Sequence, residues 1–450
     1  MMNLSDAAVA IGATHVGRDV MFMSVGTDSR AVTPGMLFVA LKGDRFDGHD
    51  YVRDVIAAGA AAAMVSRQWA AANPDMPLIA VDDTRLALGA MAAHWRAQFA
   101  IPLIGITGSN GKTTVKEMCA AILGHHCGND AVLATQGNFN NDIGLPLTLL
   151  RLRDAHRAAV IEMGMNHPVE IAYLTRLARP TVALVNNAQR AHLEGLGSVT
   201  EVARAKGEIF DGLGPDGVAV INADDPHATM WRGMNGKRTV IDFGFAGAAA
   251  VRGEWCPQGF GGVLKLNTPS GTADVALDVP GEHNARNALA ATAVCLAAGV
   301  ALADIAVGLG GYGGVKGRLQ RGRGISGATV IDDSYNANPD SMRAAIDVLA
   351  GVTGKRILVM GDMGEVGEAA AQFHDEIGGH AKSCGIEMLL ALGSLSADAV
   401  HNFGEGARHF DNVETLIAAL KPELDANTTV LVKGSRFMRM ERVVNAIKEK

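Results

Sequence analysis

The sequence is poor in aromatic residues and in cysteine. Aromatic side chains make up 5% of the 450 residues, so the hydrophobic cores must be built mainly from Ala, Val, Leu and Ile. The cysteines are odd in number and contain no CxxC pair, which argues against a disulfide framework and predicts reduced thiols in a cytoplasmic protein. The five cysteines are Cys119, Cys127, Cys256, Cys295 and Cys384.

The sequence also lacks a long apolar run and a basic cluster. Its most apolar stretch, residues 57–65, is far shorter than the roughly 18 residues that a membrane-spanning helix needs. No basic segment followed by an apolar one marks a signal peptide near the N-terminus. The formal net charge of −7, without a run of Lys and Arg, argues against nucleic-acid binding. We expect a cytoplasmic protein that neither inserts into a membrane nor binds nucleic acid.

A chain of 450 residues is too long for one ordinary core, and two to four domains are expected. Apolar strand-like runs alternate with helical patterns, which predicts an α/β fold with largely parallel sheets. Residues 242–278 differ, because their short, Gly-rich alternating segments predict an antiparallel insert. We expect three domains, spanning residues 1–99, 100–315 and 316–450.

The run GITGSNGKTT at residues 105–114 is the most informative segment. An apolar strand-like stretch precedes it and helical spacing follows it, which is the arrangement that binds a triphosphate. Backbone N–H groups and the helix N-terminus would face the phosphates, Lys112 would reach them, and Thr113 could ligate Mg²⁺. The spacing is unusual, because five residues instead of four separate Gly105 from Gly111. The segment therefore predicts a variant phosphate loop.

Polar side chains follow two other predicted strands of this central part. Glu162 ends one strand, and His192 lies shortly after another. Because ligands collect at the carboxyl ends of strands in open α/β sheets, these groups suit a divalent metal beside ATP. The alternative is a solvent-facing carboxylate and an isolated loop histidine. Lys206 lies on a predicted helix that begins at the capping box Ser198–Glu201, and an isolated helical lysine is ordinarily a solvated charge.

Three polar clusters mark the last third of the chain, at residues 317–320, 332–339 and 432–436. The second follows a strand and fits either a ligand contact or an Asx-rich turn. The third also follows a strand, where basic groups can bind a carboxylate or phosphate. The spacing leaves both choices open.

Ten motifs follow one another along nearly the whole chain, and together they resemble the Mur ligase family. They are TDSRAVTPGMLFVALKGDRFDGHD (27–50), TGSNGKTT (107–114), TQGNFNNDIGLPLTLL (135–150), VIEMGMNHPVEI (160–171), NNAQRAHLEGLGSVTEVARAKGEIF (186–210), INADDP (221–226), PGEHNARNALAA (280–291), DDSYNANPDSM (332–342), GDMGEVG (361–367) and VLVKGSRFMRME (430–441).

The resemblance implies a small N-terminal UDP-sugar-binding domain, a central ATPase domain and a Rossmann-like C-terminal domain. It also implies a reaction, the ATP-dependent joining of D-alanyl-D-alanine to UDP-N-acetylmuramoyl-tripeptide through an acyl phosphate, with Mg²⁺ as cofactor. This reaction belongs to the cytoplasmic synthesis of peptidoglycan precursors. We expect the chain to act as a monomer.

The resemblance also implies roles for individual residues. The catalytic set is Lys112, Glu162, His192 and Lys206. The implied metal ligands are Thr113, Glu162, His192 and, if it is carbamylated, Lys206. The implied ATP contacts are Gly108, Ser109, Asn110, Gly111, Lys112, Thr113, Thr114, Asn284, Arg318 and Asp333. The implied substrate contacts are Ser29, Arg30, Asp47, Gly48, His49, Asn138 and Asn141, followed by Asn336, Asn338, Ser435 and Arg436 for the dipeptide end.

Two residues depart from the family pattern. Val169 stands where Gly is common, and Phe437 stands where a small residue is common, close to the expected dipeptide site. The alternatives are the related ligase that adds the third peptide residue, a folylpolyglutamate synthetase-like ligase, and a catalytically silent nucleotide-binding regulator. The hundred or so residues before Gly105 argue against the second, and the presence of all four catalytic residues argues against the third.

Overall fold

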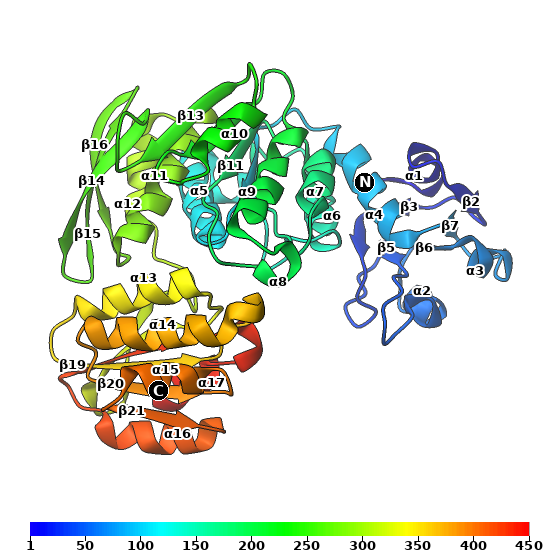
Figure 1. Ribbon diagram of the computed structural model, residues 1–450. Helices are drawn as coiled ribbons and strands as arrows, with labels where there is room; N and C mark the ends of the chain where they lie inside the picture. The colour runs from blue at the N-terminus through cyan, green and yellow to red at the C-terminus, as the bar shows by residue number, and fades with distance from the viewer. Residues whose placement is uncertain (450) are drawn as a thin grey trace.

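Three large β-sheets, each flanked by helices, follow one another along the chain in the computed structural model, which describes residues 1–449 and also contains one two-stranded pair. Figure 1 shows the N-terminal domain on the right, the central domain at the upper left and the C-terminal domain below the central one. This arrangement confirms the predicted three-domain α/β fold. In the described residues, no helix is long and apolar enough to cross a membrane.

The N-terminal domain has a five-stranded sheet of order β2-β7-β6-β5-β4, parallel except at β2, and a short antiparallel pair of β1 and β3. Its strands are β1 (Met2–Asn3), β2 (Thr14–Val16), β3 (Met21–Phe22), β4 (Ser24–Gly26), β5 (Met36–Val39), β6 (Ala62–Ser66) and β7 (Leu78–Val81). Its helices are α1 (Leu4–Ala10), α2 (Val52–Ala57), α3 (Arg67–Ala71) and α4 (Thr84–Arg96).

The central domain has a nine-stranded sheet of order β16-β15-β14-β13-β12-β11-β8-β10-β9. The pairings from β9 to β14 are parallel, and β14, β15 and β16 form the antiparallel extension predicted near residues 242–278. Its strands are β8 (Leu103–Thr107), β9 (Val132–Ala134), β10 (Ala158–Glu162), β11 (Val182–Val185), β12 (Val218–Asn222), β13 (Thr239–Gly244), β14 (Val251–Gln258), β15 (Gly261–Thr268) and β16 (Gly271–Leu277). Its helices are α5 (Lys112–Cys127), α6 (Gly144–Leu149), α7 (Glu170–Ala178), α8 (Leu193–Leu196), α9 (Val199–Gly207), α10 (Ala228–Met234), α11 (Glu282–Ala297) and α12 (Leu302–Gly310).

The C-terminal domain has a six-stranded sheet of order β17-β18-β22-β19-β20-β21, parallel except at β17. Its strands are β17 (Gln320–Arg323), β18 (Thr329–Asp333), β19 (Lys355–Gly361), β20 (Met388–Leu392), β21 (Ala407–Phe410) and β22 (Thr428–Lys433). Its helices are α13 (Pro339–Ala350), α14 (Ala370–Ser383), α15 (Ser396–Phe403), α16 (Val413–Leu420) and α17 (Glu441–Ile447).

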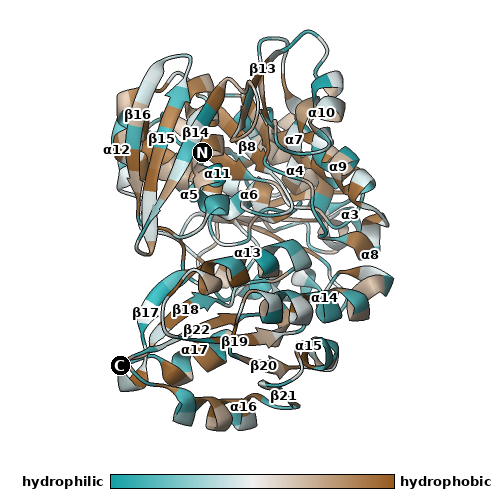
Figure 2. Cartoon of the chain, turned by 60° about the vertical axis from the view of Figure 1, so that its left-hand side comes forward, coloured by the Kyte–Doolittle hydropathy of each residue, from teal (hydrophilic) through white to brown (hydrophobic). Residues whose placement is uncertain are grey.

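Continuous apolar runs place the inner strands between two helical layers. All five residues of β8 are buried, as expected for a parallel strand covered on both faces. Side chains of α5, α11 and α12 pack on one face of the central sheet, and those of α7, α9 and α10 pack on the other. Figure 2 shows the resulting brown, hydrophobic strands between partly teal helices. The hydrophobic core beneath α7, α9 and α10 continues into the N-terminal domain through α4. The N-terminal and central domains therefore share this core.

Candidate active site

The segment between β8 and α5 forms a tight loop against the end of β11. Gly111 has φ +80° at the N-terminus of α5, and a Cβ there would collide with the side chain of Asn287. The backbone N–H of Ser109 donates to Asn187 O at 3.0 Å, and that of Asn110 donates to Asn187 Oδ1 at 2.8 Å. A glycine is therefore required where the loop turns into the helix, and the loop is held at the carboxyl end of the sheet.

Lys112 is the first residue of α5, and its Nζ donates to Gly108 O at 2.7 Å. Burial lowers the pKa of the Lys112 ammonium, and the Arg318 guanidinium adds to this effect, whereas Glu162 and Glu365 oppose it. The ammonium and the N-terminus of a 16-residue helix both favour an anion at the same place.

Glu162 ends β10, which pairs directly with β8. Its side chain is buried and accepts hydrogen bonds from Thr113 Oγ1 at 3.0 Å and from Asn140 Nδ2 at 2.8 Å. Strand β11 pairs with the other side of β8, and His192 lies beyond its end. The structure thus brings Thr113 and Glu162 into direct contact beside the phosphate loop.

His192 has φ +57° and is the N-cap residue of the short helix α8. Its Nδ1 lies 3.0 Å from Glu365 Oε2, a residue of the C-terminal domain. Burial lowers the pKa of the His192 imidazole, with further contributions from the Lys112 and Lys206 ammonium groups. The Glu365 carboxylate has its pKa lowered, chiefly by His192. A neutral imidazole with a free lone pair suits a metal ligand.

Lys206 is 1% exposed on α9, and among the described residues its side chain has no hydrogen-bond or ion-pair partner. Burial lowers its pKa well below the ordinary lysine value, and the Lys112 ammonium adds to the shift. The expectation that an isolated helical lysine is a solvated charge is therefore wrong for Lys206. Ser198 caps α9 by accepting from Glu201 N at 3.2 Å, whereas the Glu201 side chain pairs with Arg204.

The C-terminal domain contributes a cationic wall. Arg318 Nη2 donates to Thr113 Oγ1 at 3.0 Å, and its guanidinium lies 4.4 Å from the Tyr335 ring centroid. The Arg436 guanidinium lies 5.8 Å from the same centroid. Stacking on the aromatic ring holds the Arg318 guanidinium in place. Asp333 does not stand free, because Lys433 Nζ donates to its Oδ2 at 2.6 Å.

Ser435, Asn336 and Arg436 lie together at the end of β22. Ser435 Oγ accepts from Gly364 N at 2.8 Å and donates to Ala337 O at 3.1 Å, while Asn336 Oδ1 accepts from Arg436 N at 3.3 Å. The Arg436 side chain is largely exposed. Of these residues, Arg436 has the greatest freedom to meet an anionic ligand.

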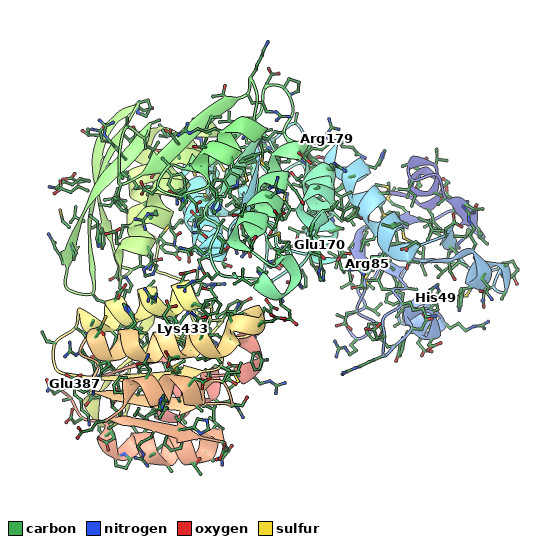
Figure 3. The ribbon with its side chains drawn as sticks, viewed as in Figure 1. His49, Arg85, Glu170, Arg179, Glu387 and Lys433 are labelled. Carbon is green, nitrogen blue, oxygen red and sulfur yellow. The ribbon has the colours of Figure 1, made fainter. Side chains whose placement is uncertain are left out.

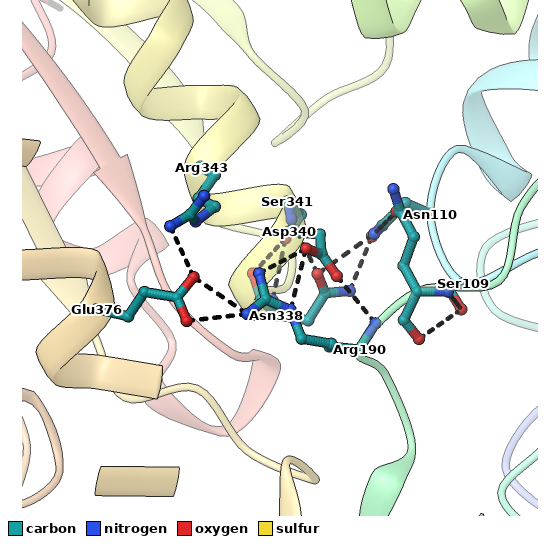
Figure 4. A network of polar contacts seen from close by, with 9 residues as sticks. Ser109, Asn110, Arg190, Asn338, Asp340, Ser341, Arg343 and Glu376 are labelled. Carbon is teal, nitrogen blue, oxygen red and sulfur yellow. Dashed lines mark hydrogen bonds and ion pairs between the residues drawn. The ribbon is translucent and has the colours of Figure 1, made fainter. Parts of the chain in front are cut away.

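A polar network joins the central and C-terminal domains beside the loop (Figure 4). Arg190 donates to both oxygens of Glu376, at 3.1 and 3.0 Å, and its side chain and backbone donate to Asp340. Asn110 and Asn338 exchange side-chain hydrogen bonds in the same region. The contacts fix α13 and α14 against the phosphate loop.

These groups line one cavity of about 980 Å³ to which all three domains contribute. The N-terminal domain supplies Arg85, which pairs with Asp142 and lies near Glu170 at the domain boundary (Figure 3). Fourteen of the expected site residues line the cavity: Ser109, Asn110, Gly111, Lys112, Thr113, Asn141, Glu162, His192, Arg318, Asp333, Asn336, Asn338, Ser435 and Arg436.

Asn284 and Thr114 lie behind the loop. Asn284 is buried on α11 and accepts from Asn287 Nδ2 at 3.3 Å, and Asn287 in turn accepts from Asn186 at 3.0 Å. Thr114 is buried on α5. An amide chain therefore connects Asn284 to the end of β11, although Asn284, Thr114, Gly108 and Lys206 do not line the cavity.

The expected UDP-sugar residues lie on the N-terminal domain, outside the cavity. His49 Nδ1 lies 2.6 Å from Asp47 Oδ1, and His49 Nε2 accepts from Ser66 N at 2.9 Å, so the proton resides on Nδ1. Arg30 is exposed and pairs with Asp28. Figure 3 shows His49 far from Lys433. Ser29 and Gly48 complete this group. The expected substrate contact Asn138 is exposed in the central domain and does not line the cavity either.

Sequence reasoning missed four residues that the structure places in or beside the cavity: Asn140, Arg190, Glu365 and Lys433. Each lies inside a motif that predicted the site, but its position in the sequence does not distinguish it from its neighbours in that motif. Lys433 is the last residue of β22, and its place in the basic cluster was the one sequence signal that pointed to it. The partners of Arg190 are 150 and 186 residues away, so no local signal revealed them.

A phosphate loop that faces a buried carboxylate, an imidazole and a cationic third domain defines the chain as an ATP-dependent ligase. Three family descriptions match it: "Mur ligase family, catalytic domain" at residues 22–96, "Mur ligase middle domain" at 106–295, and "Mur ligase, glutamate ligase domain" at 317–436. The chain belongs to the Mur ligase family.

Curated relatives and solved structures agree with this assignment. The chain is 45% identical to the UDP-N-acetylmuramoyl-tripeptide–D-alanyl-D-alanine ligase of Escherichia coli, over 100% of this chain and 98% of that protein. A crystal structure of MurF from Acinetobacter baumannii matches with a TM-score of 0.91 and 36% identity, covering 98% and 97% of the two chains. MurF from Thermotoga maritima in complex with ADP matches with a TM-score of 0.82 and 27% identity, covering 94% and 96%.

Proposed function

We propose that this chain joins D-alanyl-D-alanine to UDP-N-acetylmuramoyl-tripeptide and converts ATP to ADP and phosphate. The supporting observation is the single cavity that combines the phosphate loop, Glu162 and His192 with Arg318 and Lys433 of the third domain. Its volume of about 980 Å³ lies at the upper end of the range of small-molecule sites. The whole-length similarity to ligases of this name supports the choice of substrates.

The chemical task is to bring anions together. The γ-phosphoryl group must meet the tripeptide carboxylate, and the amine of the dipeptide then displaces phosphate from the acyl phosphate to form the amide. Lys112, the N-terminus of α5 and Arg318 surround this place with positive potential, which stabilises the charge spread over the transferring group. Because these groups are preorganised and partly buried, their effect exceeds that of the same charges in water.

The residues beside the loop fit Mg²⁺. Thr113 and Glu162 offer hard oxygen donors, and His192 Nδ1 is buried without a hydrogen-bond partner of good geometry. Magnesium ordinarily takes one or two protein carboxylates together with substrate phosphates. When bound, the ion would neutralise phosphate charge. Glu162 is held for this role by Asn140, which donates to its other oxygen.

We further propose that Lys206 is carbamylated. The buried amine has a strongly lowered pKa, and the neutral amine is the form that attacks CO₂; a C–N bond forms and the proton passes to solvent. The product carries a negative charge, which would attract Lys112 and offer oxygen donors toward the metal. High-resolution density of the active enzyme with an unmodified Lys206 would disprove the modification.

The remaining assignments follow the same division among domains. We propose boundaries at residues 1–99, 100–315 and 316–450, with the uridine end of the substrate on the first domain and the dipeptide near Asn336, Ser435 and Arg436. Asn284 is proposed to contact the adenine. We also propose that the chain works as a monomer in the cytoplasm.

Phosphate release from ATP in the presence of UDP-N-acetylmuramoyl-tripeptide tests the function. Release should require both the tripeptide substrate and D-alanyl-D-alanine, and mass spectrometry should detect the UDP-pentapeptide. If free diaminopimelate, lysine or glutamate replaces the dipeptide, the assignment is wrong.

A further inference from the structure

Two helices of the C-terminal domain bring three potential metal ligands together outside the cavity. Asp347 lies in the last turn of α13, His380 lies in the last turn of α14, and Cys384 follows α14 directly. Asp347 is exposed, whereas His380 and Cys384 are partly buried. None of the three lines the cavity or takes part in the proposed reaction.

The three donor atoms form a compact triangle. His380 Nε2 lies 2.9 Å from Asp347 Oδ1, Cys384 Sγ lies 3.6 Å from His380 Nε2, and Cys384 Sγ lies 3.9 Å from Asp347 Oδ1. With Zn–N and Zn–O distances of about 2.0 Å and a Zn–S distance of about 2.3 Å, tetrahedral ligands stand roughly 3.3–3.5 Å apart. The observed separations bracket this range, so shifts of a few tenths of an ångström would place all three atoms around one ion.

Local structure explains why the three groups converge. His380 and Cys384 are four residues apart, and the Cys384 N–H donates to His380 O at 2.9 Å, so the helical turn continues through the cysteine. Both side chains therefore face α13. The nearby Arg343 is paired with Glu376 at 2.8 Å, which leaves the Asp347 carboxylate available to a cation.

We propose that Asp347, His380 and Cys384 bind a Zn²⁺ ion, with solvent as the fourth ligand. A thiolate, an imidazole and a carboxylate are the donors that zinc accepts, whereas Mg²⁺ prefers oxygen alone. Binding releases the thiol proton to solvent. The ion would fasten α13 to α14, the two helices that meet the central domain through Asn338 and Glu376.

Cobalt substitution tests the site directly. The full-length chain is freed of metal with a chelator and titrated with Co²⁺ in the presence of ATP and excess Mg²⁺, which occupy the catalytic cavity. A thiolate–cobalt charge-transfer band in the near-ultraviolet should appear and should disappear when Zn²⁺ is added. Cys384→Ser should abolish the band. Cys127→Ser and Cys256→Ser, which alter the other two partly buried cysteines, should leave it unchanged.

Affinity and stability provide a second measurement. His380→Gln and Asp347→Asn should each weaken Zn²⁺ binding more than about tenfold, since even the groups that support a metal ligand contribute that much. Zn²⁺ should raise the melting temperature of the wild-type chain but not of Cys384→Ser, and the two metal-free proteins should melt alike. If the wild-type chain gives no thiolate band, or if Cys384→Ser retains it, the three residues form only a helix–helix ion pair.

Discussion

The side-chain amides of Asn110 and Asn338 pair reciprocally across the boundary between the central and C-terminal domains. Asn338 Nδ2 donates to Asn110 Oδ1 at 2.8 Å, and Asn110 Nδ2 lies 3.3 Å from Asn338 Oδ1. Asn338 also caps α13, because its Oδ1 accepts from Ser341 N at 2.9 Å. One side chain thus begins a helix and touches the phosphate loop.

These two roles of Asn338 can be separated by substitution. Asn338→Ser retains a capping oxygen but loses the amide that reaches Asn110, so turnover should fall while the melting temperature stays close to that of the wild type. Asn338→Ala loses the cap as well and should cost about 1 kcal/mol of stability. Thermal denaturation and steady-state kinetics measure the two effects. Full activity of Asn338→Ser would show that the pair does not assist catalysis.

Lys112→Ala should lower kcat by at least about 10²–10³-fold, since the substitution removes a preorganised charge from the transferring phosphoryl group. Binding of UDP-N-acetylmuramoyl-tripeptide, measured by calorimetry, should change little, because its uridine end is assigned to another domain. Lys237→Ala, which alters an exposed lysine, serves as the control. An equal loss of turnover and of UDP-substrate binding would contradict this division between domains.

The sequence predicted the fold well where local patterns are strong. Fully buried strands such as β8 are continuous apolar runs, and polar residues at strand ends located Glu162 and His192. The contacts between domains could not be predicted from the sequence. Asn110 pairs with Asn338, which is 228 residues away, and the partners of Arg190 lie on two helices of another domain. Pairs of this kind depend on how separate sheets pack, which no short segment encodes.

Arg190→Ala should loosen the contact between the central and C-terminal domains, because Asp340 and Glu376 lose their shared partner. We expect a larger radius of gyration in small-angle scattering and a higher KM for the dipeptide. Arg204→Ala is the matched control, because Arg204 is exposed and pairs only with Glu201 among the described residues. Identical scattering and kinetics for the two variants would contradict a role for Arg190 in domain contact.

Val169 has φ +72° and its side chain is 63% exposed. A β-branched residue rarely takes this conformation, which costs about 1–2 kcal/mol relative to an ordinary backbone. Val169→Gly should therefore raise the stability of the central domain by about 1 kcal/mol after the added chain entropy of glycine is deducted. Val169→Ala keeps a Cβ and should gain less. Denaturant unfolding of both variants measures the difference, and a destabilised glycine variant would contradict the strain.

His283 lies at the start of α11, and burial together with the Lys433 and Arg286 charges lowers its pKa to about 4. The unfolded chain takes up a proton near pH 6.5, so this residue favours the folded state above that pH. The contribution is lost as the pH falls from 6.5 to about 4. The melting temperature of the wild type should therefore drop more steeply across this window than that of His283→Gln. Parallel curves would contradict the assignment.

The cavity is lined by residues of all three domains, which determines how it can be inhibited. A small molecule that filled the cavity would contact Arg85, Lys112 and Arg436 at once. It would therefore hold the three domains in one relative arrangement. Its potency would then depend on how freely those domains move. Resistance could arise from substitutions at contacts between domains, such as those of Arg190, a residue that the inhibitor would not touch.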